Sequence, residues 1–103
     1  MMEELLKMKN FKKIERIKTP IGSVKIYITE LHSGEKRLAI ISSPKQYFKR
    51  YREKRLFNEI HKFNKEAPRV IGFGRYKKAL CLILEWKECD FMKKIVSYYK
   101  IYN

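Results

Sequence analysis

The sequence has few of the residues that build metal centres and disulfide frameworks. It contains only two cysteines, Cys81 and Cys89, and two histidines, His32 and His61, among 103 residues. These positions fit no metal-ligand spacing, so we expect neither a metal nor any other cofactor. Because Cys81 lies inside the apolar run 79–84, we expect it to be a buried free thiol.

The sequence also lacks the residue patterns of an enzyme. Its 11 acidic residues show no paired-carboxylate spacing, and none of its serines lies in a nucleophile-elbow pattern. We therefore expect a protein that is not an enzyme and that has no small-molecule substrate.

Long hydrophobic runs and targeting signals are missing as well. No stretch of about 18 apolar residues could cross a membrane, and the first residues do not have the pattern of a signal peptide. The sequence therefore predicts a soluble cytoplasmic protein without a membrane partner. Its 103 residues, of which 45% are hydrophobic, predict a single domain over residues 1–103.

Positive charge is what the sequence has in excess. The 25 lysines and arginines outnumber the 11 acidic residues, and the formal net charge is +14. Such a charge attracts polyanions, although the basic residues are spread from Lys7 to Lys100. They are densest within residues 45–55, which gives the polyanion-binding candidates Lys45, Lys49, Arg50, Arg52, Lys54 and Arg55. These residues could follow the phosphates of DNA or RNA, or they could form a solvated helix face.

Alternating and apolar segments predict two β-hairpins. Residues 23–31 alternate between apolar and polar side chains, and residues 37–42 form the returning strand after a turn that contains Gly34. A second pair of strands is predicted at 69–73 and 79–86. Residues 11–18 fit either a strand or a helix.

Two helices are predicted after the hairpins. Ser43 and Pro44 have the pattern of a helix N-terminus, so a helix should run from Pro44 to about Lys65. Its expected buried stripe consists of Leu56, Phe57, Ile60 and Phe63. Asp90 is expected to cap a closing helix whose apolar residues lie on one face.

These elements define an α+β fold in the order β-β-β-α-β-β-α, if residues 11–18 form a strand. A hairpin followed by a helix occurs at 23–65 and again at 69–103. Two such units, packed back to back, would leave a groove at their junction. This repeated hairpin–helix order is explained either by an internal duplication or by the chance succession of two hairpins.

Residues 11–95 resemble the N-terminal lobe of the protein-kinase fold. The segment FKKIERIKTPIGSVKIYITELHSGEKRLAII is similar to that lobe's first three strands, APRVIGFG to the strand after its helix, and LILEW to its hinge strand. The resemblance implies an antiparallel sheet with one packed helix. It also implies that Glu59 stands at the helix glutamate and Glu85 at the hinge glutamate.

The catalytic positions of that family are missing from this sequence. The position of the phosphate-binding lysine holds Ile41, and the glycine loop is reduced to Lys18-Thr19-Pro20-Ile21-Gly22. The sequence contains neither an H-R-D nor a D-F-G motif, which phosphoryl transfer by this family requires. The resemblance therefore implies a lobe-like scaffold without activity.

The Lys-, Ile- and Tyr-rich composition is similar to that of small accessory proteins from viruses that infect hyperthermophilic archaea. This similarity implies a thermostable viral protein that acts in the host-cell cytoplasm.

The abundance of aromatic residues favours a binding protein. The 14% of aromatic residues exceed what one small core hides, and exposed Tyr and Trp are favoured at interfaces. We therefore expect a non-catalytic domain that binds a protein or peptide through a sheet edge or through the groove between the two units. The interface candidates are Tyr47, Tyr51 and Trp86, of which Trp86 could instead be a core-edge residue. The alternative function is sequence-independent binding of DNA or RNA by the basic helix face.

Overall fold

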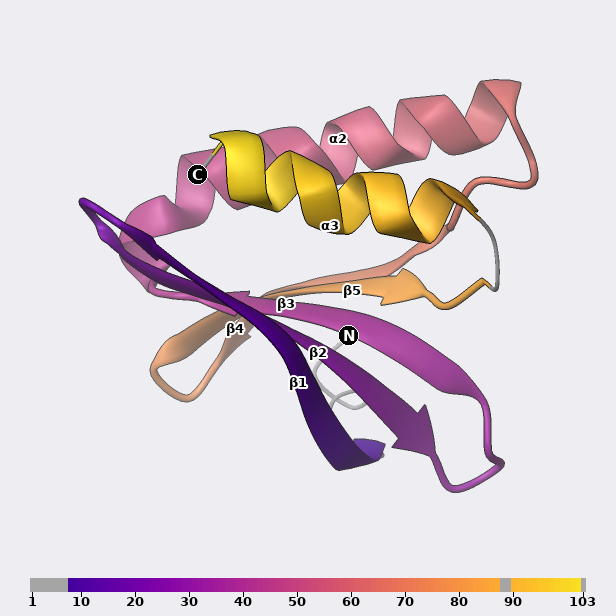
Figure 1. Ribbon diagram of the computed structural model, residues 1–103, viewed down its shortest axis with the longest axis horizontal. Coiled ribbons are helices and arrows are strands. Elements are labelled where there is room, and N and C mark those ends of the chain that lie inside the picture. The colour runs from indigo at the N-terminus through magenta and orange to yellow at the C-terminus, as the bar shows by residue number, and fades with distance from the viewer. Residues whose placement is uncertain (1–7, 88–89, 103) are drawn as a thin grey trace.

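The computed structural model describes residues 8–87 and 90–102 and shows one antiparallel sheet with two helices on one face (Figure 1). The strands are β1 (Met8–Thr19), β2 (Gly22–Leu31), β3 (Lys36–Ser42), β4 (Val70–Tyr76) and β5 (Ala79–Glu85). A short 3₁₀ turn, η1 (Pro44–Gln46), leads into α2 (Tyr47–Phe63), and α3 (Asp90–Tyr102) follows β5. The predicted α+β class and the order β-β-β-α-β-β-α are confirmed.

The five strands lie in the order β1-β2-β3-β5-β4. Every neighbouring pair is antiparallel. Residues 11–18, for which the sequence left helix and strand open, belong to β1. Strands β1 and β4 are consequently the two edges of the sheet, and β3 and β5 lie near its centre.

The two hairpin–helix units share this one sheet. The β2–β3 and β4–β5 hairpins meet where β3 pairs with β5, and both helices cover the same side of the sheet (Figure 1). The expected back-to-back packing is therefore wrong. Its physical reason is that β3 and β5 are apolar on both faces, so each is best buried as a neighbour of the other. The internal duplication remains a prediction.

The main core fills the space between the sheet and the helices. Inward side chains from β2, β3 and β5 meet buried residues of α2 and α3. The buried members are Val24, Ile26, Leu38, Ile40, Phe57, Leu82, Leu84, Met92, Ile95 and Tyr99. A smaller cluster lies on the far face, the sheet face opposite the helices, around Cys81 and Ile83.

Cys81 is a buried free thiol, as the sequence predicts. Burial raises the pKa of its thiol to about 11. A thiol with such a pKa carries very little nucleophilic thiolate at neutral pH, so Cys81 is a packing residue. The second cysteine, Cys89, lies outside the described residues.

The buried stripe of α2 differs from the expected one. Phe57 is buried and Ile60 is half-buried, but Leu56 is 46% and Phe63 is 89% exposed. The inward positions are instead taken by Arg50, Glu53 and Phe57, whose spacing of three and four residues defines one helix face. The apolar pattern was misleading because two of the three inward residues are charged.

Candidate interaction surface

Exposed aromatic rings gather where α2 passes the β4 edge. Tyr47 and Tyr51 lie one helical turn apart, with nearly parallel rings whose centroids are 6.0 Å apart. Phe73 of β4 lies against both, at 5.4 Å from Tyr47 and 6.2 Å from Tyr51. We call Tyr47, Tyr51 and Phe73 the ring cluster. Tyr47 is 42% and Tyr51 38% exposed, so the cluster presents ring surface to solvent.

A cation lies over the ring cluster. The Nζ of Lys54 is 5.5 Å from the centroid of Tyr51 and 5.8 Å from that of Phe73. These distances are within the range of a cation–π interaction. Lys54 therefore adds positive potential to the ring surface.

Strand β4, beside the ring cluster, is a short edge strand. Among the described strands it pairs only with β5, and its register is irregular between Val70 and Gly72. An edge strand presents unpaired main-chain groups that can accept another strand. Basic residues flank this edge: Arg75 at its end and Lys77 and Lys78 in the following turn are all exposed.

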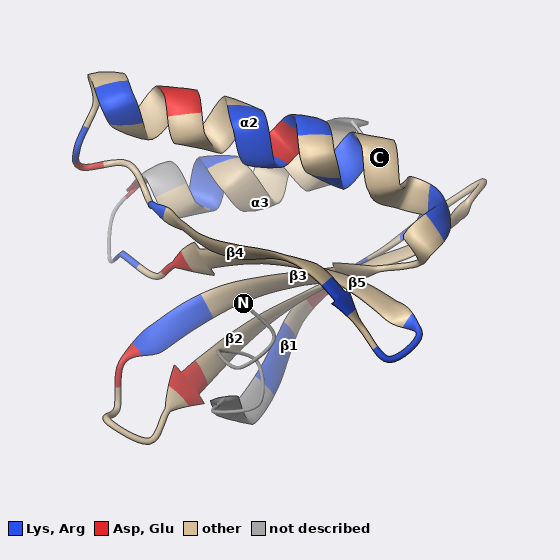
Figure 2. Cartoon of the chain, turned by 180° about the vertical axis from the view of Figure 1, so that it is seen from behind, with Lys and Arg blue, Asp and Glu red and all other residues tan. Residues whose placement is uncertain are grey.

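The polyanion-binding candidates do not form one surface. Lys45, Lys49, Arg52 and Arg55 are exposed, and Lys54 lies over the ring cluster. Arg50 was expected among them, and this placement is wrong because its side chain is fully buried. Figure 2 shows basic and acidic bands alternating along α2. Nucleic-acid binding by this helix remains a prediction.

Arg50 takes part in a buried polar network that joins α2 to α3. Its Nε lies 2.8 Å from Oε1 of Glu53, one turn along the helix. The hydroxyl of Tyr99, from α3, donates to the same carboxylate oxygen at 2.8 Å. The guanidinium also lies 5.1 Å from the centroid of the Tyr99 ring. We call Arg50, Glu53 and Tyr99 the buried triad.

Burial changes the acid–base properties of the buried triad. Desolvation raises the pKa of Glu53 above its ordinary value, although the Arg50 charge and the Tyr99 hydrogen bond act in the opposite direction. Burial also raises the pKa of Tyr99 well above its ordinary range, and the nearby Glu53 carboxylate adds to this shift. A phenol that stays protonated keeps its hydrogen bond to Glu53 across the physiological pH range.

Trp86, the third interface candidate, lies at a different surface from Tyr47 and Tyr51. It lines a shallow, mainly apolar groove where α3 passes β1 and β2. The other lining residues include Ile14, Ile28, Met92 and Val96. Trp86 is half-buried and packs against the main core, so the structure does not bring the three candidates together.

A small depression lies between the helices of the two units. It is lined by Leu56, Phe57 and Ile60 of α2 and by Lys94, Ile95 and Tyr98 of α3. The groove predicted for back-to-back units is replaced by this depression between the helices of the two units, because the units share one sheet. The depression is smaller than the groove beside Trp86.

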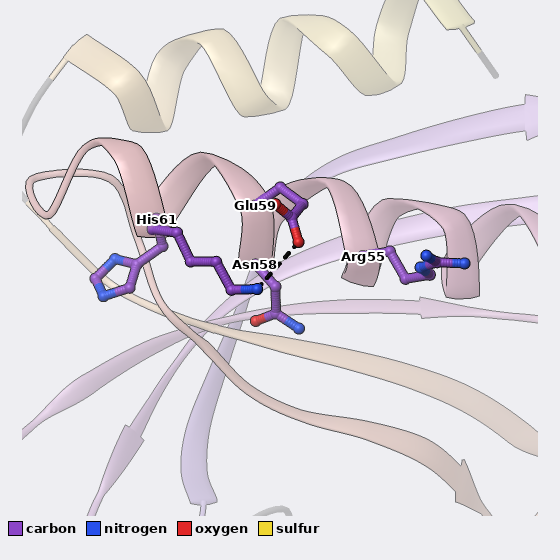
Figure 3. Close-up of a pocket in the computed structure, with 5 residues that line it drawn as sticks. Arg55, Asn58, Glu59 and His61 are labelled. Carbon is purple, nitrogen blue, oxygen red and sulfur yellow. Dashed lines mark hydrogen bonds and ion pairs between the residues drawn. The ribbon is translucent and has the colours of Figure 1, made fainter.

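A third depression lies along the outer side of α2, beside Arg55, Asn58, Glu59 and His61 (Figure 3). Glu59 is exposed and pairs with Lys62 at 3.2 Å. His61 Nδ1 lies 2.8 Å from the carbonyl oxygen of Ala67, so the ring fastens the loop after α2. The buried glutamate of this helix is thus Glu53 and not Glu59, the residue that the resemblance placed at the helix glutamate.

The described residues contain no group of three or more His, Cys, Asp or Glu side chains that could hold a metal ion. Within the same part of the chain, no helix is long and apolar enough to span a membrane.

Comparisons with known proteins give no relative: no family model, curated protein or solved structure matches this chain.

Sequence reasoning found Tyr47 and Tyr51 but missed Phe73. Phe73 lies in the segment Val70–Tyr76, where it looks like an ordinary strand residue. The glycines on both sides of it, Gly72 and Gly74, were the available signal, since glycine inside a strand marks a bulge or a close approach of another group.

Proposed function

We propose that this protein binds an extended segment of a protein partner along the β4 edge. The observation that carries the proposal is the ring cluster, which exposes aromatic surface at an edge strand whose outer side pairs with no other described strand. A peptide that adds to a sheet edge obtains affinity from main-chain hydrogen bonds and specificity from side-chain contacts. Strand β4 would supply the main-chain hydrogen bonds, and the ring cluster would supply the side-chain contacts.

The charges around the edge indicate the chemistry of the partner. Lys54 lies over the rings, and Arg75, Lys77 and Lys78 are exposed at the far end of the hairpin. A segment that carries apolar or aromatic side chains together with acidic ones would complement this surface. Charge complementarity of this kind increases the association rate and excludes basic competitors.

The function requires no catalytic group. Main-chain pairing is independent of sequence, and Tyr is enriched at interface centres because its ring gives contact area at low entropic cost. The predicted absence of enzymatic activity is part of this proposal.

The double variant Tyr47→Ser/Tyr51→Ser tests the proposal in a pull-down from the native host after nuclease treatment. We expect the double variant to retain at least tenfold less of any partner that the wild type retains, because the rings would form the centre of the interface. The matched control is Phe63→Ser, which removes an 89% exposed ring from the other end of α2 and should retain the partner. Equal retention by both variants would contradict the proposal.

A second measurement separates edge pairing from contact with the rings alone. When the retained partner is added, hydrogen exchange at β4 amides should slow, because a strand that pairs with β4 would protect them. Exchange that slows only in α2 would show that the rings bind without strand addition.

A further inference from the structure

A second charged surface lies at the opposite edge of the sheet. On the β1–β2 ribbon, Arg16 lies directly opposite Lys25, and Lys18 lies opposite Ser23. The pair between them in the register, Ile17 and Val24, faces the helix-side core. Because side chains alternate along a strand, Arg16, Lys18 and Lys25 all point to the far face.

Lys13 extends the same surface. It lies opposite Tyr27, two residues from Lys25 and therefore on the same side of β2. Lys13, Arg16 and Lys18 are exposed, and Lys25 is half-buried. We call these four residues the ribbon patch.

Within the described residues, no acidic side chain forms an ion pair with the ribbon patch. The sequence contains no Asp or Glu from residue 16 to residue 29. Glu15, between Lys13 and Arg16, lies opposite the core residue Ile26 and pairs with Lys100 of α3, on the helix side of the sheet. On α2, by contrast, Glu53 and Glu59 lie among the cations and pair with two of its basic residues.

The opposition of Arg16 and Lys25 carries an energetic cost. Like charges directly opposite each other in an antiparallel ladder destabilise the pair. An anion placed between the two side chains converts this repulsion into attraction. A surface that keeps such a pair without a carboxylate paired to either cation is therefore suited to an external anion.

The geometry points to the phosphodiester backbone of a nucleic acid as the ligand of the ribbon patch. Arg16 and Lys18 are two residues apart along β1, or about 7 Å, and together with Lys13 they form a row of cations along the strand. A backbone with regularly repeated charges can satisfy every member of such a row, and contacts of this kind are independent of sequence. Tyr27 lies on the same face, opposite Lys13, and its ring is half-buried.

The test measures the binding of a fluorescent 20-nucleotide single-stranded DNA by anisotropy over a range of salt concentrations. The ribbon variant is Arg16→Glu/Lys18→Glu/Lys25→Glu. The control is Lys49→Glu/Arg52→Glu/Arg55→Glu on the exposed side of α2. Three reversals of two charges each lower the net charge from +14 to +8 in both variants, so only the location of the change differs.

We expect the ribbon variant to lose at least tenfold more affinity than the control. Its log–log salt slope should become less steep by about 2, since about 0.7 counterions are released per phosphate contact with a single strand. Equal losses would show a diffuse attraction without a site. A larger loss in the control would place the site on α2. Binding of the wild type to phosphatidylserine vesicles in preference to the oligonucleotide would also overturn the inference.

A milder variant guards against a folding defect. Lys25→Gln removes one cation of the opposed pair, so its melting temperature without ligand should equal or exceed that of the wild type, while its oligonucleotide affinity falls. A fall in melting temperature together with unchanged affinity would show that Lys25 serves the fold only. Neither experiment involves the ring cluster. The ribbon patch can therefore fail its test while the proposed function stands, and the proposed function can fail while the ribbon patch stands.

Discussion

Helix α2 makes two lateral contacts that have opposite properties. Toward α3 it contributes Arg50 and Glu53 to the buried triad, whose charged groups are hidden from solvent and meet a hydroxyl of the opposite helix. Toward β4 it contributes Tyr47 and Tyr51, whose rings touch Phe73 but remain more than a third exposed. The polar side chains are thus buried and the aromatic ones are accessible, the reverse of the usual distribution.

This difference separates a contact that holds the fold together from a surface that is available to a partner. Buried charges are tolerated only when they are paired, so removing one member is costly. Exposed rings contribute little to folding but much to an interface. Variants on the two sides of α2 should therefore affect different quantities.

The largest effect is expected from Arg50→Met. This variant leaves the Glu53 carboxylate buried without its cation, so the free energy of unfolding at neutral pH should fall by about 3–5 kcal/mol. Urea denaturation measures this loss. The double variant Arg50→Met/Glu53→Leu removes both charges and should recover most of the stability. A loss of less than about 1 kcal/mol in the single variant would mean that the pair is not needed for the fold.

A smaller effect is expected in the pH dependence of stability. Because burial raises the pKa of Glu53 in the folded protein, the folded state retains the proton at pH values where the unfolded chain has released it. The free energy of unfolding should therefore fall as the pH rises from about 4.3, the pKa of an unfolded glutamate, through the folded pKa.

Glu53→Gln removes this titration. Urea midpoints measured from pH 4 upward should decline less in the variant than in the wild type over the acid range. Parallel curves would show that Glu53 titrates as it does in the unfolded chain.

The smallest effect on stability is expected from Tyr51→Ser at the ring cluster. Since the ring is 38% exposed and its contacts are with other rings and Lys54, the variant should lose about 1 kcal/mol or less. The same urea denaturation provides the measurement. A loss as large as that of Arg50→Met would make the ring cluster part of the core and would remove the distinction between the two contacts.

The order of the elements followed from the sequence because the strands have clear local patterns. The apolar run of β5 and the alternation of apolar and polar residues in β2 can each be recognised from residues that are adjacent in the chain. The Ser43 cap was equally local, and its Oγ accepts from the Lys45 amide at 3.2 Å.

The pairing of distant residues could not be predicted in the same way. That Arg50 is buried depends on Tyr99, which is almost 50 positions away in the sequence, and a dense basic segment gives no sign of such a partner. The ring cluster likewise needed Phe73 to come from another element. The ribbon patch depends on the register of β1 against β2, because a shift of one residue would turn its cations to the other face.

The position of β5 in the sheet also affects how the chain can fold while it is being synthesised. Strand β5 lies between β3 and β4 although it follows both in the chain. A nascent chain that has released β1, β2, β3 and α2 therefore has a complete first unit whose apolar β3 edge is unpaired. Exposed strand edges promote association between chains. We therefore expect the growing chain to be most prone to association before Leu80–Leu84 are synthesised and pair with β3.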